Sequence, residues 1–128
     1  MRRPLSNLIV ALGYCAASVA AAAEPYKVID GDTLVVDGVR WRLVGIDAPE
    51  ITHAKCPAER ALGLRAKARL EQLLAGSAWS LVARPGQVDR YGRLLGVLML
   101  NGSHVGWTLI DEGLARLYYG GKREGWCG

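Results

Sequence analysis

Two acid-rich turns carry the side chains best suited to chemistry in this sequence. Segment 30–33 reads D-G-D-T and interrupts a short β-type run, and segment 47–50 reads D-A-P-E and ends another. Converging carboxylates, joined by a backbone carbonyl and water, are the ligands that a hard cation such as Ca²⁺ takes in proteins. Taken singly, aspartates beside glycines are also ordinary turn residues. The turns therefore predict a cation site on condition that the fold brings them together.

Two arginines supply the opposite charge. Arg42 lies in an apolar strand run five positions before Asp47, and Arg93 closes the segment 89–93, D-R-Y-G-R. A guanidinium is planar, permanently charged and bidentate, which suits phosphate oxygens. Two arginines and a divalent cation around one phosphate would stabilise the charge that builds during phosphodiester cleavage. Glu50 would then be free to take a proton from water.

The elements that must position these groups form a β-rich chain with two helices. Asp37-Gly38 and Asn101-Gly102 are two-residue hairpin signals, and Gly76 and Gly113 follow the two helical patterns. We expect strands over 26–29, 34–36, 39–46, 77–84, 94–100 and 117–119, and helices over 57–75 and 103–111. The polar stretch 85–92 is expected to be a turn. This order predicts a small five-stranded barrel with helices, an α+β fold rich in β-structure.

The hairpin at 37–38 matters because it lies between the two acidic turns. We expect it to bring both turns to the same end of the sheet. On the returning strand, alternate residues face opposite sides, so Arg42 shares a face with Arg40 and Val44. A strand arginine in that place is either an exposed residue or a cation held beside the acids.

The first 23 residues differ in kind from the rest. A positive start at Arg2 and Arg3 precedes an apolar run and the small residues 20–23, which is the order of a secretory signal peptide with cleavage after Ala23. A membrane anchor fits less well because the apolar run is short and interrupted. A lipoprotein anchored on Cys15 is disfavoured by the bulky Tyr14 before it. We expect an exported domain, 24–128, in a periplasm or outside the cell.

Removal of this segment would leave 14 basic and 12 acidic residues and two of the three cysteines. The mild positive charge permits a nucleic-acid partner without requiring one. Cys56 and Cys127 would meet oxidising conditions, so we expect a disulfide that ties the C-terminal tail to the first helix; two free thiols are the alternative. A zinc site is not indicated, because neither His53 nor His104 stands at ligand spacing with the cysteines.

The remaining aromatic and basic residues have simpler interpretations. Trp41, Trp79 and Trp107 sit in apolar runs and are predicted to belong to the core rather than to stack on a ligand. His53 is expected to be a solvated loop residue and His104 to lie near a helix start. The basic residues of the first helix are most simply its solvated face.

Three segments closely resemble the signature blocks of the thermonuclease (staphylococcal nuclease-like) family. They are 28–33 (V-I-D-G-D-T), 41–50 (W-R-L-V-G-I-D-A-P-E) and 89–93 (D-R-Y-G-R), and they come in the family's order and approximate spacing. Segment 109–116, L-I-D-E-G-L-A-R, is a looser match to the family's second helix. The resemblance covers nearly all of the chain from Tyr26 to Tyr119. It implies an OB-type five-stranded barrel with two helices, the family's third, C-terminal helix apparently missing.

The resemblance also implies a role for each matched residue. Asp32 and Asp47 would be carboxylate ligands of Ca²⁺, with the backbone carbonyl of Ala48 as a third protein oxygen. Mg²⁺ or Mn²⁺ is not excluded, since oxygen ligands alone admit either. Glu50 would be the general base or would orient the attacking water. The scissile phosphate would be clamped by Arg42 and Arg93.

Further matched positions surround this set. Arg90 and Tyr91 match positions that help to hold a terminal phosphate of the nucleotide. Tyr118 or Tyr119 matches a tyrosine that packs against the nucleotide, and Asp30 resembles a second acid near the metal.

The implied activity is Ca²⁺-dependent hydrolysis of DNA and RNA, preferably single-stranded, by a monomer, leaving 3′-phosphate ends. A site that reads phosphate and cation has little access to base edges, so weak sequence preference is expected. The alternative is an inactive OB-fold module that binds nucleic acid or protein. All five residues of the metal and phosphate set are present, which argues against that alternative.

Overall fold

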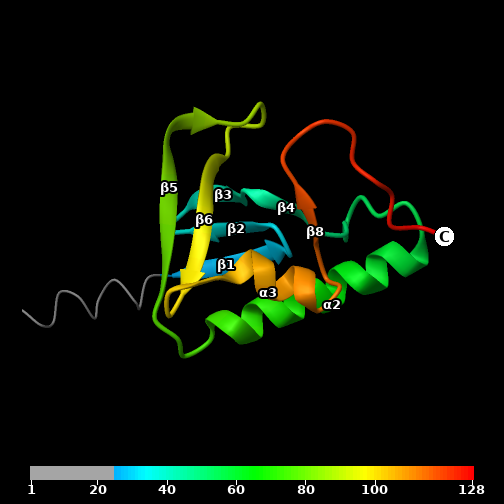
Figure 1. Ribbon diagram of the computed structural model, residues 1–128, viewed down its shortest axis with the longest axis horizontal. Helices are drawn as coiled ribbons and strands as arrows, with labels where there is room; N and C mark the ends of the chain where they lie inside the picture. Colours follow the sequence, from blue (N-terminus) through cyan, green and yellow to red (C-terminus); the bar gives the residue numbers. More distant parts are fainter. Residues whose placement is uncertain (1–24) are drawn as a thin grey trace, which may run out of the picture.

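The computed structural model describes residues 25–128, and the predicted signal segment 1–23 lies outside the described residues. Figure 1 shows a strand-rich body with two helices packed along one side and a C-terminal tail that returns toward the start of the first of them. No helix within residues 25–128 is long and apolar enough to cross a membrane.

The strands form two sheets. In the larger sheet β1 (Tyr26–Asp30), β2 (Thr33–Val36), β3 (Val39–Leu43), β6 (Leu94–Leu100) and β5 (Trp79–Val88) are neighbours in that order, and β7 (Ser103–His104) pairs with β6. Only β3 and β6 run parallel. The smaller sheet pairs β4 (Gly45–Asp47) with β8 (Arg116–Tyr118). The β-rich architecture with two helices is confirmed, and the strands are not closed into a barrel by hydrogen bonds among the described residues.

Both predicted hairpin turns are confirmed. Asp37 and Gly38 have φ values of 51° and 82°, which suit a two-residue turn that matches the strand twist, and Val36 pairs directly with Val39 across it. Asn101 and Gly102 repeat this geometry, with φ of 52° and 80°, between β6 and β7.

The continuous strand expected over 39–46 is wrong, because the chain turns at Val44 and Gly45. Gly45 has a φ of 89°, a conformation that favours glycine, and β4 leaves the larger sheet there to pair with β8. Asp47 is thereby placed at the end of β4, paired with Arg116 of β8. The predicted turn over 85–92 is also wrong in its first half. β5 runs on to Val88, which pairs with Leu94 after an irregularity in the ladder, and only 89–92 turns.

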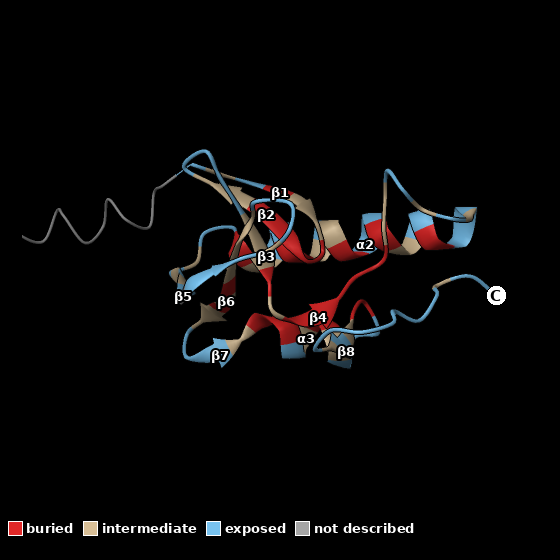
Figure 2. Cartoon of the chain, turned by 90° about the horizontal axis from the view of Figure 1, so that it is seen from above, coloured by how far each residue is buried: buried red, intermediate tan, exposed pale blue. Residues whose placement is uncertain are grey.

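Helix α2 (Pro57–Leu74) begins after Cys56, as its proline predicts, and ends just before Gly76. Its buried residues recur at intervals of three and four, so one face packs against the strands. Figure 2 shows the buried residues gathered between α2 and the strands and along β4. The core consists of Val28, Leu34, Leu43, Ile46, Ala66, Leu70, Leu74, Leu98, Val105, Leu109, Leu114 and Ala115.

Helix α3 (Val105–Asp111) begins two residues later than expected. Ser103 belongs to β7, and His104 caps the helix by accepting a hydrogen bond from the Gly106 N–H at 3.0 Å. Trp41 and Trp79 pack against the core as predicted. Trp107 does not: it is 42% exposed and stacks on the His104 ring at 4.3 Å.

The predicted Cys56–Cys127 disulfide is present, with 6.1 Å between the two Cα atoms. It fixes the tail that follows β8, residues 119–128, which contains no helix.

Candidate active site

The two acidic turns lie against each other, as the hairpin between them predicts. The Ala48 N–H donates a hydrogen bond to Asp32 Oδ2 at 2.8 Å. A Cβ on Gly31 would lie 2.7 Å from the Ala48 side chain, so this contact requires glycine in the first turn. The Leu43 N–H donates to the Asp32 carbonyl at 2.9 Å and fixes the turn against β3.

The two predicted metal ligands are both buried. Asp32 is 4% exposed and also accepts a hydrogen bond from the Thr33 hydroxyl at 3.1 Å. Asp47 is 3% exposed, and its Oδ2 accepts a hydrogen bond from the Trp126 indole at 3.2 Å. Its Oδ1 forms an ion pair with the Arg123 guanidinium at 2.6 Å. A buried carboxylate of this kind requires a positively charged partner.

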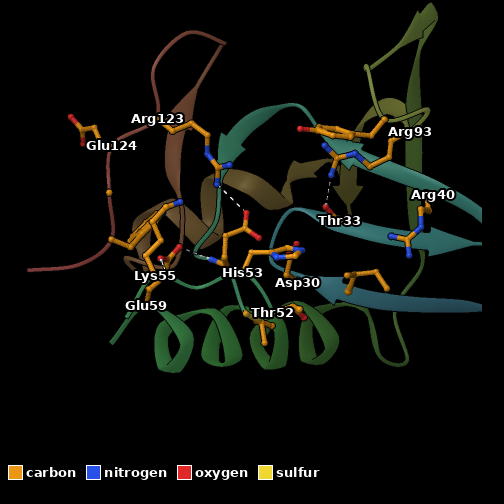
Figure 3. A pocket seen from close by; sticks show the side chains of 16 residues that line it. Asp30, Thr33, Arg40, Thr52, His53, Lys55, Glu59, Arg93, Arg123 and Glu124 are labelled. Atoms are coloured by element: carbon orange, nitrogen blue, oxygen red, sulfur yellow. Dashed lines mark hydrogen bonds and ion pairs between the residues drawn. The ribbon is translucent and has the colours of Figure 1, made fainter. Parts of the chain in front are cut away.

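Asp30 adds a third acid to the same place. Its Oδ1 accepts a hydrogen bond from the Asp32 N–H at 3.1 Å, and its side chain lines the cleft in Figure 3. Burial, together with the negative charges of Asp32 and Glu50, raises the pKa of Asp30 to about 7. Burial and the neighbouring acids therefore disfavour a negative charge on Asp30.

Both predicted phosphate-binding arginines reach this region. Arg42 Nη1 lies 3.5 Å from Asp32 Oδ2 and donates to the Leu43 carbonyl at 2.6 Å. Arg93 forms an ion pair with Asp89 at 2.6 Å through Nε and donates to the Thr33 hydroxyl at 3.2 Å through Nη1, as Figure 3 shows. Burial opposes the charge of Asp89, but hydrogen bonds from Arg93 and the Tyr91 N–H outweigh it and lower the pKa of Asp89. Asp89 thus holds Arg93 in place, which the sequence analysis missed.

A cleft of about 800 Å³ opens beside the two acidic turns, and Asp30 and Thr33 of the first turn line it. Glu50, Arg93 and Tyr91 line it, and so does Arg40, which the sequence analysis did not assign to the site. Asp32, Asp47 and Arg42 do not line the cleft, but Asp32 contacts its lining residue Thr33 and Asp47 contacts its lining residue Arg123.

Some predicted substrate residues are elsewhere. Tyr118 and Tyr119 do not line this cleft; they border a second hollow of about 280 Å³ that Asp47 also lines. Tyr118 donates a hydrogen bond to the Gly121 carbonyl at 2.7 Å. Arg90 does not line the cleft either, but its guanidinium donates to the Tyr91 hydroxyl at 2.9 Å, so it acts on the cleft through that ring.

Glu59 positions the loop that carries Glu50. Its buried carboxylate accepts hydrogen bonds from the backbone N–H of Glu50 at 3.0 Å and of Lys55 at 2.9 Å. Burial would raise the pKa of Glu59, but these hydrogen bonds and the nearby Lys55 and Arg123 charges lower it. The sequence analysis missed Glu59, although Cys56 and Glu59 stand at the spacing of a capping box at the start of a helix.

The C-terminal tail contributes the other residues that sequence reasoning missed. Arg123 forms ion pairs with Asp47 at 2.6 Å and Glu50 at 3.1 Å. Desolvation opposes its charge, but these acids outweigh it and raise the pKa of Arg123, so the guanidinium is charged. The Trp126 indole donates a hydrogen bond to Asp47. No periodic pattern in the tail sequence indicates the contacts of Arg123 or of Trp126.

The donor set fits a hard divalent cation in kind. Asp32 and Asp47 offer buried carboxylates, and Ala48 beside them is buried. No group of three or more His, Cys, Asp or Glu side chains in metal-binding geometry occurs within residues 25–128. A site completed by a backbone carbonyl and water does not need such a group.

Comparison with known proteins agrees with the resemblance. The family model of staphylococcal nuclease homologues matches residues 40–125. The chain is 33% identical to the thermonuclease of Staphylococcus hyicus over 70% of its length, 37% to Endonuclease YncB of Bacillus subtilis over 73%, and 35% to the micrococcal nuclease of Shigella flexneri over 77%.

These matches cover 55%, 46% and 60% of the relatives' own lengths, so the chain spans about half the length of the proteins it resembles. The family match covers most of the chain and includes Arg42, Asp47, Glu50 and Arg93. The chain belongs to the family of staphylococcal nuclease homologues.

Proposed function

We propose that this protein is a Ca²⁺-dependent nuclease that hydrolyses phosphodiester bonds of DNA and RNA. One observation carries the proposal. Glu50 and Arg93 line one cleft, and the buried carboxylates of Asp32 and Asp47 contact its lining residues Thr33 and Arg123. This combination offers a proton acceptor and a phosphate clamp in the cleft, with a candidate cation site next to it.

The roles follow from what each group can reach. Asp32, Asp47 and the Ala48 carbonyl would hold the cation, which when bound supplies Lewis-acid polarisation of the phosphate and neutralises its charge. Glu50 would take a proton from the attacking water. Arg93, oriented by Asp89, and Arg42, oriented by Asp32, would bind non-bridging phosphate oxygens. Asp30 would add negative charge behind the cation.

Substrate range and products belong to the same proposal. The cleft presents charge, and Tyr91 supplies an exposed aromatic ring at its edge, 67% exposed, on which a base can stack without being read. We therefore propose single-stranded DNA and RNA as preferred substrates, little sequence preference, 3′-phosphate products and a monomeric enzyme. Mg²⁺ and Mn²⁺ are to be tested as alternative cations, because oxygen ligands admit them.

Export is also proposed. The Cys56–Cys127 disulfide supports it, because such bonds persist in oxidising compartments, and the tripartite pattern of residues 1–23 is the second support. Detection of the cleaved chain, beginning near Glu24, in a periplasmic or culture fraction would test this.

The test of activity is cleavage of single-stranded DNA by the purified protein with Ca²⁺ and with a chelator. Arg42→Ala and Glu50→Gln should each lose at least three orders of magnitude if each group supplies about 4 kcal/mol of transition-state stabilisation. Glu71→Gln, the same change on an exposed face of α2, is the matched control and should keep full activity. Wild-type rates in both site variants would contradict the assignment. Tight DNA binding without turnover would instead identify an inactive binding module.

A further inference from the structure

The tail places a third guanidinium inside the cleft. Figure 1 shows the tail running from β8 back toward the start of α2, and Figure 3 shows the Arg123 side chain pointing from it into the cleft. The guanidinium lies 2.6 Å from Asp47 Oδ1 and 3.1 Å from Glu50 Oε2. It therefore contacts both the proposed cation ligand and the proposed base.

Several contacts of the tail hold Arg123 in this position. Cys127, which lies four residues after Arg123 in the tail, is bonded to Cys56. Trp126 donates its indole N–H to Asp47 Oδ2 at 3.2 Å, and the Arg116 guanidinium lies 3.7 Å from the Trp126 ring centroid. Arg116 also donates to the Gly125 carbonyl at 2.7 Å. Contacts on the C-terminal side of Arg123 thus fix where its side chain can reach.

The ion pair with Asp47 is incompatible with a bound cation. The Arg123 guanidinium lies 2.6 Å from Asp47 Oδ1, so a cation bound to this oxygen would occupy the same space. Two positive charges so close would also repel each other. The Arg123 side chain is 44% exposed and lines the cleft together with Arg93, so it has room to turn into the cleft.

We propose that Arg123 is a third phosphate-binding arginine of the site. Without the cation, its guanidinium neutralises Asp47 and Glu50; with the cation bound, it donates to a non-bridging phosphate oxygen of the nucleic acid in the cleft. This inference rests on the proposed function. It adds a phosphate-binding residue from the disulfide-bonded tail to the two arginines on the strands and their turns.

The first measurement is the salt dependence of kcat/KM on single-stranded DNA for Arg123→Gln, Arg123→Lys and the control Lys122→Gln. Lys122 is the neighbouring exposed cation and forms no ion pair among residues 25–128. Arg123→Gln should lower kcat/KM by roughly 10-fold or more and reduce the slope against log salt by about 0.7, the value of one phosphate contact on a single strand. Arg123→Lys should restore the slope with only part of the rate, because lysine keeps the charge but loses the fork. Lys122→Gln should leave both unchanged.

The second measurement is Ca²⁺ binding by calorimetry without nucleic acid. Arg123→Gln should bind Ca²⁺ more tightly than wild type and Lys122→Gln, by about 5-fold or more, because a competing cation has been removed. Tighter Ca²⁺ binding with an unchanged salt slope would show that Arg123 is only a counter-ion and would overturn the proposal. Unchanged binding and slope would overturn it as well.

The two proposals fail in different ways. An inactive wild-type protein would refute the nuclease function, whatever Arg123 does. In that case the salt slope is measured on binding of a labelled oligodeoxythymidylate in Ca²⁺, and equal slopes for Arg123→Gln and Lys122→Gln would overturn the inference separately. Thermal unfolding and thiol titration of each variant verify that the fold and the disulfide are intact, and Arg123→Lys carries the test if Arg123→Gln does not fold.

Discussion

At the scale of single residues, the Thr33 hydroxyl joins the cation side of the site to its phosphate side. It donates a hydrogen bond to Asp32 Oδ1 at 3.1 Å and accepts one from Arg93 Nη1 at 3.2 Å. Thr33 is 4% exposed, so water does not readily replace either bond. The orientation of Arg93 therefore depends on the same group that orients Asp32.

Thr33→Val is expected to lower kcat by about 10- to 100-fold. Its free energy of unfolding is expected to be only about 1–2 kcal/mol below that of the wild type. Valine keeps the shape of the side chain but leaves one buried oxygen and one guanidinium N–H without a partner. Thr33→Ser retains the hydroxyl and should retain most of the activity. Cleavage kinetics and urea unfolding of the two variants provide the check, and equal activity of Val and Ser at this position would contradict the linking role.

Glu59→Gln is expected to lower the free energy of unfolding by about 2 kcal/mol at pH 7, because a charged acceptor of two backbone hydrogen bonds is lost. The pKa of Glu59 is lower in the folded protein than its usual 4.5, so its stabilising contribution is fully present above that value. The contribution is lost as the pH falls through the folded pKa. The stability difference between wild type and variant should therefore shrink below about pH 4. Urea unfolding at pH 7 and pH 3 measures it, and a difference that does not change with pH would exclude this cause.

At the scale of elements, the close approach of α2 to the loop that carries Glu50 depends on Gly63. A Cβ at this position would lie 2.7 Å from the Glu50 carbonyl oxygen and 2.9 Å from that of Pro49. From the sequence, Gly63 is only a weak point in a helix; in the fold it is where the active-site loop rests on the helix.

Gly63→Ala is expected to reduce both stability and activity. Helix propensity alone favours alanine by about 1 kcal/mol. The contact with two backbone oxygens costs about 1–3 kcal/mol and moves the loop, and with it Glu50. Arg65→Ala, on the exposed face of the same helix, is the control and should change neither property. A Gly63→Ala protein that is more stable and fully active would show that the loop accommodates the methyl group without cost.

The elements themselves follow largely from local signals in the sequence. Asp37-Gly38 and Asn101-Gly102 are turns whose conformation the residues select, and Pro57 and Gly76 bound the helix between them. The break at Gly45 escaped local reasoning because an apolar run containing one glycine reads as a single strand. What ends β3 is the availability of β8 as a partner for β4, more than seventy residues later in the chain.

In the candidate site, too, some residues could be predicted from local motifs and others could not. Asp32, Asp47, Glu50 and Arg93 stand in motifs that show their chemistry, and the hairpin predicts that the acids converge. Arg123 meets Asp47 and Glu50 only through tertiary structure, from a tail whose glycine-rich sequence has no period. The one local hint was Cys127, because a disulfide to Cys56 had to bring the tail near the start of α2.

At the scale of the whole molecule, the disulfide joins the C-terminal tail to the start of α2. The two cysteines are 71 residues apart, and the loop between them contains α2, the larger sheet's β5 and β6, and α3. A crosslink of that span restricts the unfolded chain strongly, and the chain-entropy estimate for it is on the order of 4 kcal/mol. In the folded protein it also holds Trp126 against Asp47 and Arg123 against Glu50.

Cys127→Ser should therefore weaken the fold and the site together. Cys127 is the better cysteine to replace, because Cys56 also caps α2 by accepting the Glu59 N–H at 3.3 Å. We expect a loss of up to about 4 kcal/mol in the free energy of unfolding and a reduced kcat/KM, since the tail no longer fixes Arg123. Urea unfolding and cleavage assays of wild type and variant, each with and without a reductant, measure both effects. Reductant should bring the wild type to the level of the variant and leave the variant unchanged. A variant as stable as the oxidised wild type would show that the body stands without its crosslink, and unchanged kcat/KM would show that the tail's other contacts suffice to position Arg123.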